Sequence, residues 1–203
     1  MIIAIIGGIG SGKTLTAIHN IVDKKGFCYT NFNLKGYSDY HRLKFEDIVR
    51  YDTDEKGNKH PSGVNWNFWN KARKAHRSFN IYLDEVQNVV NSRTSMSNVN
   101  KLMSQWLSQI RKLYNDSPDS NLYIISQKIR RIDVNFRELA QLFIKCSKAI
   151  VKGKTYIIND YYLDCSADHM LERRIGRTFF IADPYFKRYS TKEIIDFGDS
   201  DYI

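Results

Sequence analysis

The amino-acid sequence predicts an α/β fold, with a mainly parallel sheet flanked by helices and a small antiparallel addition at the C-terminal end. Residues 2–6 form an uninterrupted run of isoleucine and alanine, which is typical of a strand buried on both faces of a parallel sheet. Strand-like and helical patterns then alternate, and this order implies crossover helices between parallel strands. We expect one domain over residues 1–203, with the β-rich addition starting near residue 152.

The first half of the chain supplies a helix, a second strand and a polar connection. Apolar residues recur at helical spacing over residues 14–22, and residues 26–34 are expected to form a strand that ends in a loop. Residues 35–64 are polar and irregular, and the turn-rich stretch 51–63 predicts an exposed loop. The following segment, 65–76, is expected to be helical.

The second half supplies two further core strands and the antiparallel addition. Apolar, β-branched and aromatic residues at 79–85 and at 122–127 predict strands, and each run ends in polar side chains. Between them, residues 97–114 carry one apolar stripe and predict an amphipathic helix. The remaining segments are expected to be a short helix with a strand, an antiparallel strand and a partner for that strand: 138–151, 154–164 and 177–186.

Composition and charge restrict the class of protein. The chain has 203 residues, 42% of them hydrophobic, which is enough for an ordinary core. Three widely spaced cysteines, Cys28, Cys146 and Cys165, show no disulfide or metal pattern and indicate a reducing compartment. No apolar run reaches the roughly 18 residues of a membrane helix, so we expect a soluble protein in the cytoplasm of its cell or host. The formal net charge of +9 favours an anionic partner, with solubility alone as the alternative explanation.

A phosphate-binding loop is predicted directly after the first strand. Residues 7–14, GGIGSGKT, fit the pattern G-x-x-x-x-G-K-[ST], and the required strand and helix flank them, which disfavours a plain glycine-rich turn. Glycines let successive N–H groups point at an anion, and the helix that follows adds its positive N-terminal end. Lys13 would reach the β- and γ-phosphates of ATP, and the Thr14 hydroxyl would bind Mg²⁺. The residues expected to surround the nucleotide are Gly7, Gly8, Ile9, Gly10, Ser11, Gly12, Lys13, Thr14 and Leu15.

Polar side chains at the ends of the two later core strands predict the rest of the same site. Asp84 would hold Mg²⁺ directly or through water, and Glu85 would orient or deprotonate the attacking water. Helix capping by Asp84 is the alternative. Gln127 would face the crevice where ligands bind in open α/β sheets and would sense the γ-phosphate or position the water. Capping of its own strand is the alternative for Gln127.

The arginines have two candidate roles. One is an arginine finger, which stabilises the charge on the transferred phosphoryl group. The candidates for it are Arg111, Arg130, Arg131 and Arg137. The other is contact with DNA phosphates, for which a basic cluster follows the strand at 122–127. Its members are Lys128, Arg130 and Arg131. A solvated surface is the alternative for each of these side chains.

Several short motifs together resemble one known family. The phosphate loop is followed, in order, by CYTNFNL, IYLDE, QIRKLYNDSPDSNLYIISQ and IDVNFRELAQ, and PYFKRYSTKEII comes near the end of the chain. This series is similar to that of zonular occludens toxin-like ATPases, which are phage and virus proteins related to the FtsK–HerA group of DNA-pumping motors. The likeness extends from residue 2 to about residue 195.

The resemblance implies a RecA-like P-loop NTPase core of the ASCE class, an oligomeric ring, expected to be a hexamer, and movement of viral double-stranded DNA or extrusion of virions. By position, Gln127 matches the polar sensor, and Arg111 and Arg137 match arginines of which one acts on a neighbour's nucleotide. Many filamentous-phage members carry a membrane helix and a further domain. Their absence from this sequence favours packaging of viral DNA in the host cytoplasm, with possible virion association, over export with coat protein at a membrane. Coat or portal-like virion proteins are further candidate partners.

Two other classes of protein share the phosphate loop. Small-molecule kinases commonly carry an arginine-rich lid and lack an acid pair followed by a strand that ends in Gln. A non-catalytic nucleotide switch is disfavoured because Glu85 has the position of a catalytic base. The sequence therefore favours an ATPase that requires ATP and Mg²⁺.

Overall fold

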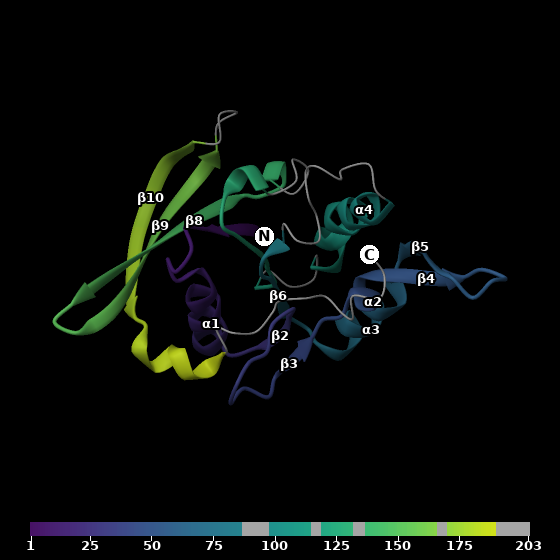
Figure 1. Cartoon of the computed structure of the whole chain (residues 1–203), viewed down its shortest axis with the longest axis horizontal. Helices are drawn as coiled ribbons and strands as arrows, with labels where there is room; N and C mark the ends of the chain where they lie inside the picture. The colour runs from purple at the N-terminus through teal and green to yellow at the C-terminus, as the bar shows by residue number, and fades with distance from the viewer. Residues whose placement is uncertain (87–97, 115–118, 132–136, 166–169, 190–203) are drawn as a thin grey trace.

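One eight-stranded sheet runs through the molecule (Figure 1). This computed structural model describes residues 1–86, 98–114, 119–131, 137–165 and 170–189. The strands of the sheet, in spatial order, are β10 (Leu171–Ile181), β9 (Lys154–Cys165), β8 (Leu142–Val151), β1 (Ile2–Ile6), β7 (Leu122–Ser126), β6 (Phe79–Leu83), β2 (Phe27–Thr30) and β3 (Tyr40–Arg42). A second sheet pairs β4 (Val49–Thr53) with β5 (Lys59–Val64). The helices in the described ranges are α1 (Lys13–Lys24), α2 (Phe45–Ile48), α3 (Trp66–Ala75), α4 (Asn98–Leu113) and two short 3-10 helices, η3 (Ile129–Arg131) and η4 (Asp183–Arg188).

The large sheet has a parallel body and an antiparallel end. Strands β8, β1, β7, β6, β2 and β3 run parallel to one another, whereas β9 is antiparallel to both β8 and β10. All five residues of β1 and all five of β7 are buried, as expected for strands covered on both faces. The prediction of a mainly parallel sheet with an antiparallel C-terminal addition is therefore confirmed.

The alternation of side chains along β1 divides the core between the two faces of the sheet. Ile3 and Ile5 pack in a cluster with Ile18 and other apolar residues of α1. Residues 2, 4 and 6 point to the other face, into a cluster that contains Trp69 of α3 and Trp106 of α4. Helix α1 therefore covers one face and α3 and α4 the other. Figure 1 shows β8–β10 at one end of the molecule and the β4–β5 hairpin at the opposite end.

Residues 35–64 are more regular than the sequence predicts. They contain β3, α2 and the β4–β5 hairpin. The stretch 51–63 is largely exposed, as predicted, but it forms most of this hairpin, so the prediction of a loop is wrong. The carboxylate of Asp54 closes the hairpin turn by accepting hydrogen bonds from the N–H of Asn58 at 2.8 Å and from its amide Nδ2 at 3.0 Å. At the base of the hairpin Val64 is buried in the core on the side of α4. The hairpin thus depends on one polar side chain and on tertiary burial, neither of which produces an alternating pattern.

The strand predicted at 177–186 has different ends in the structure. Strand β10 starts earlier and stops at Ile181, and η4 follows it. Pro184 lies in the first turn of η4 and has no N–H with which to continue a strand ladder. The ring of His19 on α1 stacks on Phe180, with 4.1 Å between ring centroids. The end of β10 and η4 therefore return the chain to the helix that follows the phosphate loop.

Candidate functional site

The phosphate loop leaves the carboxyl end of β1, which is held by β7 on one side and β8 on the other. Two of its glycines are required by close packing. A Cβ on Gly7 would overlap the Ser11 side chain and lie 2.7 Å from the carbonyl oxygen of Cys146 on β8. Gly12 has a left-handed φ of 93°, and a Cβ there would overlap the side chain of Ile157 on β9. The loop is therefore pressed against the neighbouring strands.

The phosphate loop and the start of α1 bring several hydrogen-bond donors together. Helix α1 begins at Lys13, and Gly12 offers no side-chain cap to the first-turn N–H groups. Within the described ranges, the buried hydroxyl of Ser11 has no hydrogen-bond partner. The ammonium of Lys13 is almost fully buried and donates to the carbonyl oxygen of Gly8 at 3.1 Å. These donors fit the phosphates of a nucleotide, which would accept hydrogen bonds from all of them.

The two residues predicted to hold the metal are in direct contact. The Thr14 hydroxyl donates to Oδ2 of Asp84 at 2.6 Å, which joins the start of α1 to the end of β6. Asp84 is 1% exposed, and this burial raises the pKa of its carboxyl to about 6. A hydroxyl and a buried carboxylate are oxygen ligands suited to Mg²⁺, which keeps several of its waters and needs few protein ligands. The pair therefore fits a magnesium ion bound together with a nucleotide.

Asn31 positions Asp84, a role that sequence analysis missed. Its side chain lies at the end of β2 and is fully buried. Its Nδ2 donates to the Asp84 carbonyl oxygen at 2.8 Å, and its Oδ1 accepts from the Asp84 N–H at 2.7 Å. This double hydrogen bond fixes the backbone of the acid. The motif CYTNFNL, which ends β2, was the available signal, but its partner lies 53 residues away.

Glu85 occupies a left-handed turn directly after Asp84. Its φ is 49°, an uncommon value for a residue with a side chain, and such a conformation costs on the order of 1 kcal/mol. Its N–H donates to Oδ1 of Asp84 at 2.8 Å, so both carboxylate oxygens of that acid are engaged. The turn leaves the Glu85 side chain half-buried at the carboxyl end of the sheet. Its predicted role as catalytic base stays a prediction.

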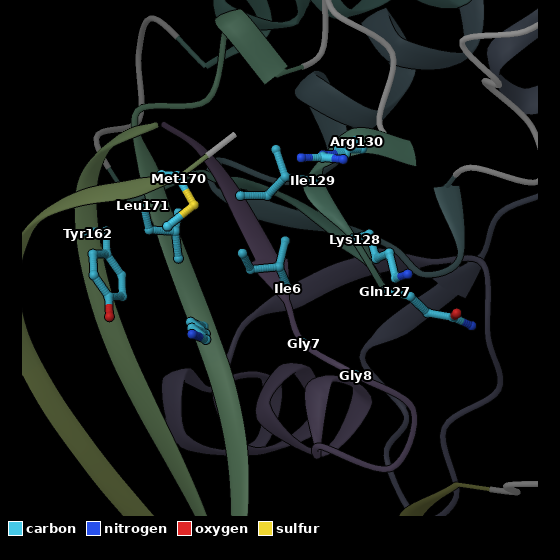
Figure 2. A pocket seen from close by; sticks show the side chains of 11 residues that line it. Ile6, Gly7, Gly8, Gln127, Lys128, Ile129, Arg130, Tyr162, Met170 and Leu171 are labelled. Carbon is cyan, nitrogen blue, oxygen red and sulfur yellow. The ribbon is translucent and has the colours of Figure 1, made fainter. Parts of the chain in front are cut away.

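A cavity of about 420 Å³ lies against the start of the phosphate loop (Figure 2). Gly7, Gly8 and Gln127 line it, so the structure brings the predicted polar residue of β7 to the same crevice as the loop. Three cations also line it: Lys128, Arg130 and Lys145. Lys145 of β8 was not singled out from the sequence because nothing local distinguishes it from Lys148, the other lysine of that strand. Positively charged side chains therefore line the cavity beside Gly7 and Gly8.

The two arginines predicted to act on a neighbour's nucleotide lie on other parts of the fold. Arg111 belongs to α4, and its side chain is outside the described part of the structure. Arg137 lies near the amino end of β1, where the N–H of Gln141 donates to the carbonyl of Ile2. Its charge acts on Cys165, at the end of β9. The structure does not bring Arg137 to the phosphate loop of its own chain, and a role in trans stays a prediction.

A comparison with known protein families identifies the family of this chain. A family model described as Zonular occludens toxin (Zot) matches residues 1–192. This chain belongs to the Zot family. The Zot-family match covers the phosphate loop, Asp84, Gln127 and β8–β10. Within the described residues of this Zot-family chain, no helix has the length and apolar character needed to span a membrane.

One solved structure of the family shares this fold, and two further structures show weaker similarity. The N-terminal domain of zonular occludens toxin from Neisseria meningitidis is 18% identical, with a TM-score of 0.57 over 93% of this chain and 98% of that one. The DNA-packaging ATPase B204 from Sulfolobus turreted icosahedral virus is 17% identical, with a TM-score of 0.46 over 86% of this chain and 98% of B204. B204 from Sulfolobus turreted icosahedral virus 2 in complex with ATP-gammaS is 16% identical, with a TM-score of 0.42 over 71% of this chain and 74% of that one. No match was found among curated proteins.

In this Zot-family chain Tyr189, which directly follows η4, lies close enough to Asp84 to interact with its charge. Burial raises the pKa of the Tyr189 phenol, and the negative charge of Asp84 raises it further. Backbone contacts hold this segment in place, because the N–H of Lys35 donates to the Arg188 carbonyl at 2.7 Å. The Arg188 guanidinium in turn donates to the carbonyl of Gly36 at 2.8 Å. No local sequence signal marks Tyr189, because its relation to Asp84 is entirely tertiary.

Proposed function

We propose that this chain is a Mg²⁺-dependent ATPase that works as an oligomeric ring and moves viral DNA. One observation carries the proposal: the Thr14 hydroxyl and the buried Asp84 carboxylate meet at the mouth of a phosphate loop. This contact joins the start of α1 to the end of β6 and so brings together the two halves of a nucleotide site. The net charge of +9 supports an anionic polymer as the partner.

The residues of the site divide the work as follows. Lys13 would leave the Gly8 carbonyl and donate to the phosphates, while Thr14 and Asp84 hold the metal. Magnesium, when bound, would neutralise charge that develops on the phosphate oxygens. The Glu85 carboxylate would take a proton from the attacking water, and Gln127 would hold that water by a hydrogen bond.

The decisive experiment measures ATP hydrolysis by the purified chain, with and without double-stranded DNA. We expect Mg²⁺-dependent turnover that DNA stimulates. The Lys13→Ala variant should lose nucleotide affinity, whereas Glu85→Gln should bind ATP and fail to turn it over. Absence of hydrolysis in the wild-type chain under both conditions, with Lys13→Ala indistinguishable from it, would discard the ATPase.

The partner and the ring are tested separately. Light scattering in the presence of ATP and DNA should give a mass several times the 23.8 kDa of one chain. A monomer under these conditions contradicts the ring. Co-purification with coat protein, together with no affinity for DNA at low salt, would replace DNA movement by a role in virion export.

A further inference from the structure

One face of the antiparallel end of the sheet is exposed and carries an unusual set of side chains. Cys146 of β8 and Ile157 of β9 point toward α1, where they contact Thr16 and Leu15. The residues that alternate with them therefore point away from α1. In the strand register these are Lys145, Asp160 and Arg177 in one row, and Ile158 and Phe179 in another. We call this surface the β8–β10 face.

The charges on the β8–β10 face are held in one cluster with a positive excess. Arg177 binds Asp160 with both branches of its guanidinium, at 2.8 and 2.9 Å. Nε of Arg174 lies 3.0 Å from the same carboxylate. The hydrogen bonds from Arg177 lower the pKa of Asp160, and the charges of Arg174 and Lys145 lower it further. Three cations therefore share one anion. The side chains of both arginines remain about half exposed, so they can reach a further anion.

Aromatic side chains lie beside the cations on the β8–β10 face. Phe179 is 70% exposed, and the ring of Tyr156 lies 6.3 Å from it. Tyr162, in the register position next to Arg174, is half-buried. Aromatic rings displayed on an open strand surface among arginines and lysines are the groups on which unpaired bases stack.

The β8–β10 face continues into the cavity beside the phosphate loop. Lys145 and Tyr162 belong to both, and the cavity also contains Gly7, Gly8 and Arg130 (Figure 2). Figure 2 shows Tyr162 on one side of Ile6 and Arg130 on the other. A ligand on the β8–β10 face would thus reach Gly7 and Gly8 of the phosphate loop without crossing the sheet.

We propose that the β8–β10 face binds an unpaired DNA strand. Its phosphates would contact Lys145, Arg174 and Arg177, and its bases would stack on Phe179 and Tyr156. A duplex keeps its bases stacked inside and would leave Phe179 in water. The inference rests on the proposed movement of DNA and specifies the form of the strand that is held.

The test measures binding of a fluorescent oligothymidine of about 12 nucleotides by anisotropy, over a range of salt concentrations. Phe179→Ala should weaken binding about tenfold and leave the salt dependence unchanged, because it removes stacking only. Arg174→Gln should reduce the slope of log affinity against log salt by about 0.7, the value for one phosphate contact on a single strand. Arg177 still binds Asp160 in that variant, so no buried carboxylate is left unpaired.

Lys148→Gln is the matched control. It removes the same charge from β8, but Lys148 follows Cys146 by two residues and therefore points to the opposite face. We expect this variant to bind the oligonucleotide like the wild type. Equal losses in Lys148→Gln and Arg174→Gln would overturn the proposal, because they would indicate a non-specific charge effect.

Other results separate this inference from the proposed function. Turnover of ATP without DNA should match the wild type in Phe179→Ala and Arg174→Gln, because both residues lie outside the nucleotide site. If the wild type hydrolyses ATP and binds DNA but neither variant weakens binding, only the β8–β10 assignment fails. Tighter binding of a duplex of the same length, or equal competition by anionic lipid vesicles, would also overturn it. A wild-type chain that hydrolyses no ATP would instead refute the proposed function.

Discussion

At the scale of single residues, burial disfavours the ionised carboxylate of Asp84, and a bound metal ion would stabilise it. Asp84 is buried, and its carboxylate accepts hydrogen bonds from Thr14 and from the N–H of Glu85. These two bonds do not offset desolvation, because the pKa of the carboxyl still rises to about 6. A bound cation would favour the ionised form, so affinity for Mg²⁺ and protonation of Asp84 should oppose each other.

The raised pKa of Asp84 predicts the pH dependence of stability. The folded chain favours the protonated acid, so this contribution to stability is present at low pH and is lost as pH rises through about 6. Asp84→Asn should therefore raise the free energy of unfolding by about 2 to 3 kcal/mol near pH 8 and by little near pH 4. Urea denaturation of both chains at the two pH values, without nucleotide or metal, measures the difference. A gain that is equal at both pH values would contradict the assigned cause.

At the scale of elements, the strands and loops that could be predicted are those that a local pattern of residues specifies. The runs at residues 2–6 and 122–127 predicted strands because both lie between two layers of helices and are apolar throughout. The phosphate loop was predicted because the residues that define it, 7–14, are contiguous in the sequence. The β4–β5 hairpin was missed because Asp54 and the burial of its base hold it together instead of a strand pattern. Strand β3 was missed for a related reason, since it has only three residues.

Packing around the phosphate loop predicts unequal effects of two glycine substitutions. Gly10 and Gly12 both have left-handed φ values, 71° and 93°, but only Gly12 faces another side chain, that of Ile157. Gly10→Ala should cost about 1 kcal/mol of stability through backbone strain alone. Gly12→Ala should cost about 2 to 4 kcal/mol, because overpacking adds to the strain. Thermal unfolding of the two variants provides the comparison, and equal losses would show that Ile157 yields without cost.

At the scale of the whole molecule, the candidate site draws on segments spread over almost the entire chain. Thr14, Asn31, Asp84 and Tyr189 come from four segments, and of these four residues only Thr14 and Asp84 were predicted from the sequence. Asn31 and Tyr189 could not, because what makes them relevant is contact or charge acting between distant segments. The succession of core strands and helices along the chain was predicted, whereas the return of η4 to α1 was not.

The contact between η4 and α1 predicts a long-range contribution to stability. The ring of Tyr185 lies 5.2 Å from that of His19 and 5.6 Å from that of Phe180, and it packs in the cluster that contains Leu15. Tyr185→Ala should lower the free energy of unfolding by about 1 to 2 kcal/mol. Phe186→Ala is the control, because the neighbouring Phe186 is 43% exposed and should matter by less than about 0.5 kcal/mol. Chemical denaturation should separate the two variants, and similar values would place η4 outside the cooperative fold.

The position of Tyr189 has a consequence for synthesis in the cell. The phosphate loop emerges from the ribosome long before the segment of Tyr189, whose phenol interacts with the charge of Asp84. A nascent chain therefore cannot complete the surroundings of Asp84 until the segment that contains Tyr189 has been translated. Fragments that end just before η4 would contain the phosphate loop and Asp84 but would lack Tyr189, which lies near Asp84 in the folded chain.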